Sequence, residues 1–246
     1  MILFKNRFEG QPLSKPHCDC FNLFGPYKSK NNKAELKVHA DTQDRECKAW
    51  RDLLYLIDEA AMDKREVFEP AKELGVENWK TIETLPREIS KLKHVKHLQL
   101  YSSHLTWIPP ELGEMESLEE FTPYTSYKLH WFPYEITKCK KLVRSTVSTR
   151  ALYGNYKFRP PFPRLRGNPV KLYGDNAKCS VCGKTDNERG LNQVWISLRV
   201  ATDVLPLLVH TCSKQCLEQL PRPAEGYVQR SHKGGLGLAQ PKRSYI

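Results

Sequence analysis

Residues 85–105 read LPREISKLKHVKHLQLYSSHL, and two further stretches of the chain follow the same pattern. They are IPPELGEMESLEEFTPYTSYKL at residues 108–129 and FPYEITKCKKLVRSTVSTRAL at residues 132–152. Each copy has a proline near its start, at Pro86, Pro109 and Pro133. The prolines are 23 and then 24 residues apart, and a nearly constant period of this length indicates units that stack and bury a shared core.

Each copy also carries the pattern L-x-x-L-x-L. The matching residues are Val95, Leu98 and Leu100, then Leu118, Phe121 and Pro123, then Leu142, Ser145 and Val147. Together with the opening L-P-x-E-I-x-x-L, the pattern resembles a leucine-rich repeat of the type with a short helical segment on its convex side. The resemblance implies short parallel strands on the concave side. Pro123 and Ser145 depart from the pattern, so we expect irregular strands and a short solenoid.

A helix is predicted before the repeats, over residues 41–63. Asp41 or Thr42 can cap it, because a short side-chain oxygen accepts the free N–H groups of a first turn. Apolar residues recur at helical spacing on one face, which indicates core packing: Trp50, Leu53, Leu54, Ile57 and Ala61. We expect residues 1–78 to form an N-terminal segment with this helical cap, residues 34–39 to include a short strand, and residues 79–155 to form the repeats.

Residues 156–173 are rich in proline and arginine, and they predict a linker or a wrap over the last open edge of the repeat sheet. Residues 174–246 contain four cysteines in two closely spaced pairs: Cys179, Cys182, Cys212 and Cys216. Between the pairs, residues 194–200 and 204–210 predict a hairpin, and a short helix follows the second pair. A knuckle, a hairpin and a helix in this order resemble a treble-clef zinc finger.

The cysteine spacing favours zinc, because a spacer of two or three residues lets one turn supply two of four tetrahedral ligands. Four cysteines would close the coordination shell, so we expect a structural zinc ion and not a catalytic one. Two alternatives stay open at this point. His210 could replace one cysteine as a ligand, or the thiols could be free or paired as two disulfides.

Weaker candidates lie elsewhere. His17, Cys18 and Cys20 form an HCDC stretch that could bind metal, but no second pair of ligands is evident, and we interpret it as a local turn with a buried cysteine. Cys47 and Cys139 are interpreted as packing residues. Residues 233–241 are glycine-rich but lack the ending of a phosphate loop, so we expect a flexible tail.

In this repeat type, the residues between the buried strand positions face the concave side and align into columns. The columns are His97, Glu120 and Arg144, then Gln99, Thr122 and Thr146, then Tyr101, Tyr124 and Ser148. Tyrosine offers a large contact area and a hydrogen bond, which suits protein recognition. We therefore predict a partner-binding surface here, with an ordinary hydrated sheet face as the alternative.

Composition sets the class of protein. The chain has 246 residues, of which 39% are hydrophobic and 27% charged, as in globular proteins. No signal peptide or membrane span is recognisable, so we expect a cytoplasmic protein without membrane contact. The net charge is +11, and within residues 157–246 the basic residues exceed the acidic ones by 9. Such an excess suits either nucleic acid or an acidic protein partner.

The expected fold class is therefore α+β, a short leucine-rich repeat solenoid with an N-terminal helical cap and a C-terminal treble-clef-like zinc module. Because no catalytic constellation is evident, the leading hypothesis is a non-catalytic protein-binding scaffold. The whole chain resembles bacterial leucine-rich repeat proteins with a C-terminal cysteine finger that occur beside secreted polymorphic toxins. This resemblance implies an immunity protein that binds and neutralises a toxin.

Two further hypotheses remain open. The chain could bind RNA or DNA, because basic residues interleave with aromatic ones that could stack on bases: Arg159, Arg164, Arg166 and Lys171 with Phe158, Phe162 and Tyr173. It could also be an enzyme, such as a ligase that recruits a substrate through its repeats, although no cysteine nucleophile with a nearby His and Asp is evident. The sequence indicates neither the partner nor the oligomeric state.

Overall fold

The structure is a computed structural model that describes Cys18, Cys20 and residues 36–172, 177–185 and 190–242. His17 and Tyr173, which the sequence singled out, lie outside the described residues. The chain has a mixed α/β fold with one parallel sheet and one mixed sheet. Helices and strands therefore occur together as predicted.

The parallel sheet joins the three sequence repeats side by side. Its strands, in spatial order, are β1 (Val67–Phe68), β2 (His97–Gln99), β3 (Glu120–Thr122) and β5 (Arg144–Ser145). His97 lies opposite Glu120, which in turn lies opposite Arg144, so equivalent repeat positions are neighbours. All nine apolar-pattern positions are buried, including Pro123 and Ser145. The predicted strands are thus present at the predicted places, and they are short.

A 3-10 helix follows the proline of each repeat on the other side of the stack. These helices are η1 (Arg87–Lys91), η2 (Pro110–Glu114) and η3 (Tyr134–Lys138). The prolines occupy the N-cap position, where the ring holds φ near −70° and prepares the chain for the turn. A Cβ on Gly113 would lie 2.5 Å from the carbonyl oxygen of Glu135, so η2 and η3 can approach this closely only because residue 113 is glycine.

The helix at the N-terminal end of the stack is α2 (Lys48–Met62), and the predicted start near residue 41 is wrong. Cys47 caps it, since its sulfur accepts the N–H of Trp50 at 3.4 Å. Trp50, Leu53 and Ile57 are buried as predicted. Two shorter helices, α3 (Pro70–Leu74) and α4 (Val76–Trp79), follow β1.

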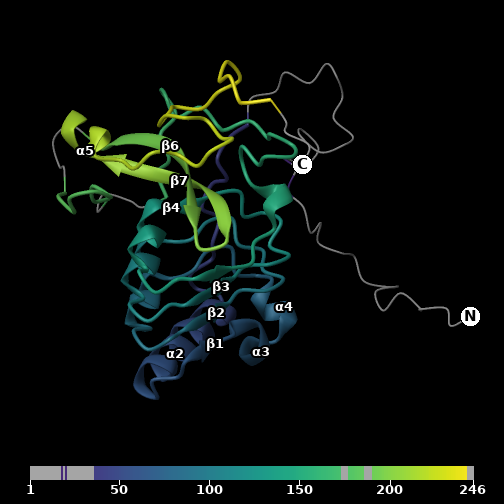
Figure 1. The fold of residues 1–246 in the computed structure, drawn as a ribbon. Coiled ribbons are helices and arrows are strands. Elements are labelled where there is room, and N and C mark those ends of the chain that lie inside the picture. Colours follow the sequence, from purple (N-terminus) through teal and green to yellow (C-terminus); the bar gives the residue numbers. More distant parts are fainter. Residues whose placement is uncertain (1–17, 19, 21–35, 173–176, 186–189, 243–246) are drawn as a thin grey trace, which may run out of the picture.

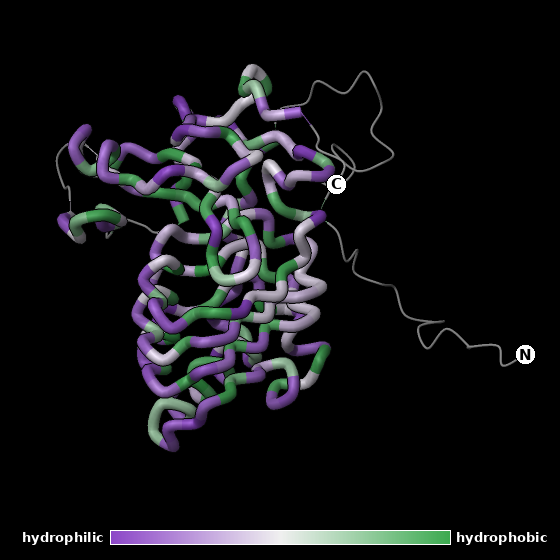
Figure 2. The backbone as a smooth tube through the Cα atoms, viewed as in Figure 1, coloured by the Kyte–Doolittle hydropathy of each residue, from purple (hydrophilic) through white to green (hydrophobic). Residues whose placement is uncertain are grey.

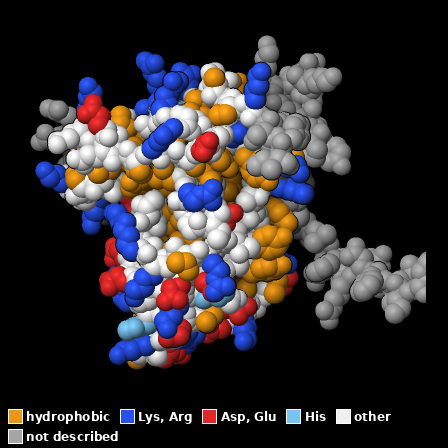
Figure 3. Space-filling model, viewed as in Figure 1, with side chains coloured by type: hydrophobic (Ala, Val, Ile, Leu, Met, Phe, Trp, Pro, Cys, Tyr) orange, Lys and Arg blue, Asp and Glu red, His pale blue; other side chains and the backbone are white. Residues whose placement is uncertain are grey.

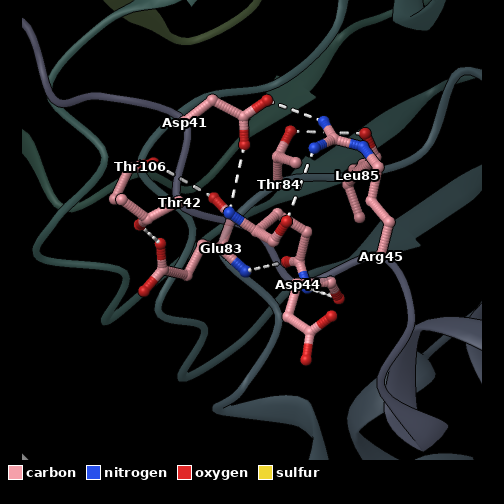
Figure 4. Close-up of polar contacts among 9 residues, drawn as sticks. Asp41, Thr42, Asp44, Arg45, Glu83, Thr84, Leu85 and Thr106 are labelled. Atoms are coloured by element: carbon pink, nitrogen blue, oxygen red, sulfur yellow. Dashed lines mark hydrogen bonds and ion pairs between the residues drawn. The ribbon is translucent and has the colours of Figure 1, made fainter.

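Polar side chains explain why the helix starts late (Figure 4). Asp41 accepts the N–H of Gln43 and Asp44 accepts the N–H of Glu46, which are local turns that compete with helix. Gln43 in turn accepts the N–H of Glu83 at 2.7 Å, and the Thr42 hydroxyl donates to the Glu83 carboxylate. The segment before α2 is therefore held to the first repeat, and residues 36–40 form no strand, contrary to prediction.

At the other end of the stack lies the hairpin of β6 (Asn192–Val200) and β7 (Asp203–Thr211), as predicted. Strand β4 (Phe132–Pro133) of the third repeat pairs in parallel with β7, and α5 (Lys214–Glu218) follows the hairpin. Figure 1 shows the hairpin above the stacked repeats and α2 below them. Hydrophobic residues of the repeats and of both hairpin strands form one continuous core. Figure 2 shows hydrophobic segments in both parts of the chain. The repeats and the C-terminal module thus share a core.

Two expectations about the C-terminal half are wrong. Of the two alternatives for residues 156–173, the wrap is wrong: the described residues 156–172 do not cover the last edge of the repeat sheet, because Phe162 and Leu165 pack with Trp195 of the hairpin in a second hydrophobic cluster. The predicted tail, residues 233–241, is packed on the fold as well: Gly235 donates its N–H to the carbonyl of Phe162 at 2.8 Å, and the Lys233 carbonyl accepts the N–H of Leu165 at 2.8 Å. A Cβ on Gly234 would lie 2.1 Å from the carbonyl oxygen of Pro163, so this glycine permits close packing.

Candidate functional site

Four cysteine sulfurs meet at the far end of the hairpin, as the spacing predicted. Cys179 and Cys182 lie on a tight turn in which Gly183 has a φ of +75° and donates its N–H to the carbonyl of Cys179 at 2.8 Å. Cys212 directly follows β7. Cys216 lies in the first turn of α5, whose N-cap Ser213 accepts the N–H of Cys216 at 3.1 Å.

The distances between the sulfurs suit a tetrahedral metal ion. All four Sγ atoms lie within 4.8 Å of one another. Cys212 Sγ is 3.5 Å from Cys182 Sγ and 3.7 Å from Cys216 Sγ. Zinc–sulfur bonds of about 2.3 Å place tetrahedral ligands about 3.8 Å apart. The cluster could therefore hold a metal ion with little adjustment, and no disulfide links the described cysteines.

The electrostatics of the cluster favour a thiolate at Cys179. Burial acts to raise the pKa of this thiol, but hydrogen bonds from the backbone N–H groups of Cys182, Cys212 and Val181 outweigh it and lower the pKa to about 6. Hydrogen bonding to the neighbouring thiols, that of Cys182 first, raises the pKa of Cys212 to about 12. Backbone donors aimed at a sulfur are the kind of outer contact that orients and stabilises a metal-bound thiolate.

His210 does not join the four sulfurs. Its side chain contacts the Gln193 amide at 2.9 Å inside the protein, and burial lowers its pKa to about 4. Its backbone instead anchors the turn at residues 179–183, called the knuckle from here on, because Ser180 and His210 exchange hydrogen bonds of 2.8 and 3.0 Å. The alternative in which His210 replaces a cysteine ligand has no support in this geometry.

The knuckle also reaches the repeats through Glu135 of η3. The residue is 9% exposed and lies beside a cleft of about 370 Å³ that is bordered by η2, η3 and the knuckle. Burial raises the pKa of Glu135, and a hydrogen bond with Ser180 opposes the rise. A buried acid without a cation in close contact is costly when ionised, so this contact depends on pH.

The structure reveals a second cluster that the sequence did not predict. Cys18, Cys20, His39 and His130 bring their ligand atoms within 4.8 Å of one another, and this group could also hold a metal ion. The HCDC stretch supplied the only signal. The two histidines escaped notice because His130 lies in the third repeat, 112 residues after Cys18. A local turn with a buried cysteine therefore describes this stretch poorly.

The predicted partner-binding residues lie along the strands in the expected columns. Glu120 pairs with Arg144 at 2.5 Å and approaches the His97 ring at 3.8 Å. His97 also contacts the Thr122 hydroxyl at 2.8 Å, and Gln99 contacts His97 at 3.3 Å. This side of the sheet is polar and linked by hydrogen bonds.

Two tyrosines extend the surface at the carboxyl ends of β2 and β3. The rings of Tyr101 and Tyr124 are 5.8 Å apart, and the residues are 48% and 43% exposed. Aromatic side chains such as tyrosine are enriched at protein interfaces. Thr146 is exposed, whereas Ser148 is buried and does not contribute to the accessible surface.

The basic segment is only partly available for binding. Phe162 is 2% exposed and belongs to the core, and the Arg159 guanidinium donates to the carbonyls of Gly154 and Gly226. Arg164, Arg166 and Lys171 are exposed. Figure 3 shows Lys and Arg side chains over the upper part of the molecule, while the lower repeats carry both signs of charge.

No protein-family model matches the chain, and no curated protein matches it in sequence. Among the described residues, no helix is both long and apolar enough to cross a membrane.

Proposed function

We propose that the chain is a non-catalytic protein-binding scaffold, in which a short leucine-rich repeat solenoid presents its strand face to a partner. The pair of exposed, touching tyrosines at the ends of β2 and β3 carries this proposal. Tyr101 and Tyr124 follow the polar column of Gln99 and Thr122 on the same strands, and this combination of aromatic anchors and polar neighbours is typical of protein interfaces.

The four-cysteine cluster is proposed to be a structural zinc site. Four sulfurs at tetrahedral spacing match the ligand preference of zinc and leave no open position for water, which a catalytic zinc needs. The bound ion would hold the knuckle and α5 at the end of the hairpin, a region with few apolar residues of its own. In this role the metal supports the scaffold and takes no part in binding.

The proposed partner is a toxin, and the chain its cytoplasmic immunity protein. Support comes from the repeat-plus-finger resemblance and from the charge: a protein with a net charge of +11 can attract an acidic domain before contact. The nucleic-acid alternative is weaker because Arg159 and Phe162 are engaged within the fold. Against the ligase alternative, Cys139 is a poor nucleophile, because burial raises its pKa to about 11, opposite to the shift of an activated thiol.

The binding surface can be tested by capture from the native host. Tagged chain should retain a host protein that is lost with the double variant Tyr101→Ala/Tyr124→Ala and kept with Tyr55→Ala, a 65% exposed tyrosine on α2. If the captured protein is a toxin, its expression should arrest growth, and co-expression of this chain should restore growth. Capture that is equal for the double variant and the control would place the interface elsewhere, and capture of RNA alone would favour the nucleic-acid alternative.

A further inference from the structure

The second Cys/His cluster joins three distant parts of the chain. Cys18 Sγ lies 3.0 Å from Nε2 of His130, and Cys20 Sγ lies 3.3 Å from Nε2 of His39. The two imidazole rings are also close, with centroids 5.0 Å apart. Two sulfurs and two ring nitrogens therefore converge on one point, in a region that the four-cysteine cluster does not touch.

We propose that Cys18, Cys20, His39 and His130 form a second, structural metal site of the Cys2His2 class, suited to zinc, which clamps the N-terminal segment onto the third repeat. The donor set is one that zinc prefers. Zinc–sulfur bonds of about 2.3 Å and zinc–nitrogen bonds of about 2.0 Å separate tetrahedral S and N ligands by about 3.6 Å. The two observed S–N distances need to open by only a few tenths of an ångström.

The hydrogen bonding of His130 fits it for this role. Its Nδ1 lies 2.6 Å from the carbonyl oxygen of Ala151, and because a carbonyl only accepts, Nδ1 must carry the proton. The lone pair of a neutral ring is then on Nε2, the atom that faces Cys18. A metal-binding histidine usually donates its other N–H to a carbonyl or carboxylate in this way, which fixes both the tautomer and the ring orientation.

His130 is also held rigidly in place. The residue is 1% exposed, between the buried Leu129 and Trp131, and its ring packs on that of Tyr153 with centroids 5.2 Å apart. Its backbone carbonyl accepts the N–H of Tyr153 at 3.1 Å. Such support is what a preorganised ligand requires, and it is more than an incidental surface histidine receives.

The proposed metal site lies next to the second hydrophobic cluster, which is rich in aromatic residues. Leu36 is 2% exposed, and together with Val38 and Cys20 it packs against the second hydrophobic cluster. That cluster includes Trp131 from the repeats and Trp195 from the hairpin, whose rings are 5.8 Å apart. Leu36, Val38 and Cys20 are the apolar contacts of the described residues before His39, so a metal ion is an effective way to add to this small contact.

The charge balance is consistent with a buried site. With both sulfurs bound as thiolates and both imidazoles neutral, the two thiolates cancel the charge of a divalent ion. The neutral assembly can then lie beside apolar rings without an uncompensated charge. Four ligands complete the shell, which assigns the ion a structural role.

Metal analysis of the freshly purified full-length chain tests the proposal. We expect two zinc ions per chain, one after Cys18→Ser/Cys20→Ser, one after Cys179→Ser/Cys182→Ser, and two after the control Cys47→Ser, a cysteine outside both clusters. Cobalt loaded into the two double variants should distinguish the sites, because the thiolate charge-transfer band is stronger for four sulfurs than for two. One metal per wild-type chain, or an unchanged count in the Cys18/Cys20 variant, would overturn the proposal.

Ligand exchange and fluorescence keep the test independent of folding defects. His39→Cys retains a zinc ligand and should keep the second metal, whereas His39→Ala should lose it. Loss of this metal ion should also expose the side chains of Trp131 and Trp195, so that a quencher reduces their fluorescence more strongly. A disulfide between Cys18 and Cys20 in the native protein, detected as a mass 2 Da below the reduced form, would contradict the metal site. Partner capture through Tyr101 and Tyr124 is measured in a separate experiment. The metal site and the protein-binding surface can therefore be refuted independently.

Discussion

The Thr202 hydroxyl donates to the backbone carbonyl of Ser145 at 2.7 Å and accepts the backbone N–H of the same residue at 3.1 Å. Ser145 lies on β5, the last strand of the parallel sheet, and Thr202 lies in the turn between β6 and β7. One side chain thus satisfies the donor and the acceptor that an edge strand normally leaves open. The hairpin turn, and not the described residues 156–172, covers this edge.

This contact predicts a measurable loss of stability. Thr202→Val removes the hydroxyl but keeps the shape, and the free energy of unfolding should fall by about 1 kcal/mol, because water can reach Thr202 and partly replace the lost bonds. Urea denaturation provides the measurement, with Thr146→Val at an exposed position of the repeat surface as the control. Equal stability of the two variants would show that the edge is held by other contacts.

The shared core predicts that the repeats and the hairpin unfold together. Leu98 is 0% exposed, and Leu98→Ala should lower the free energy of unfolding by about 3 kcal/mol through lost burial and a cavity. Val143→Ala, at a position that is 63% exposed, should cost less than about 0.5 kcal/mol. Circular dichroism and tryptophan fluorescence should report the same midpoint for each variant. Separate midpoints would mean that the two parts are independent domains.

Removal of a ligand from the four-cysteine cluster should have a local effect. Cys179→Ser should release that metal and speed hydrogen exchange in residues 177–185 and in α5, because these segments depend on the ion. The central residues of β6 and β7 should stay protected, since Leu207 and Val209 are fully buried in the shared core. Protection that is unchanged at the knuckle would argue against a metal there.

Burial of Glu135 predicts a pH effect with a definite sign. Because the folded state raises the pKa of this carboxyl, folding favours the protonated form, and its contribution to stability declines as pH rises above the unfolded value. Glu135→Gln removes that penalty. The melting temperature of the variant minus that of the wild type should therefore be larger at pH 7 than at pH 4. Glu225→Gln, at an exposed position, should show no such trend.

Features with a local signature were predicted well from the sequence. The repeats follow from a period that can be read directly, and the four-cysteine cluster follows from spacings within single turns. The register of β2, β3 and β5 then places His97, Glu120 and Arg144 in the predicted column. In each case the residues that act together are either neighbours in the chain or related by the repeat.

Features that depend on distant contacts were missed. Nothing near Cys18 in the chain points to His130, because only the stacking of the third repeat brings them together. The helix start was misplaced because Asp41 and Asp44 use their carboxylates for local turns. The tail was misread because Gly234 serves close approach to Pro163, a contact that composition alone does not reveal.

Both ends of the stacked repeats are covered by other parts of the chain, and this limits the number of repeats. With α2 against the first unit and Thr202 bonded to the last strand, a new copy of the motif cannot simply be appended at either terminus. Growth by duplication would have to occur between existing units. A repeat inserted after His130 would separate that histidine from β4, the strand that pairs with the hairpin. The extent of the strand face is thus fixed by architecture, and diversification of that face must come from side-chain changes on a frame of constant size.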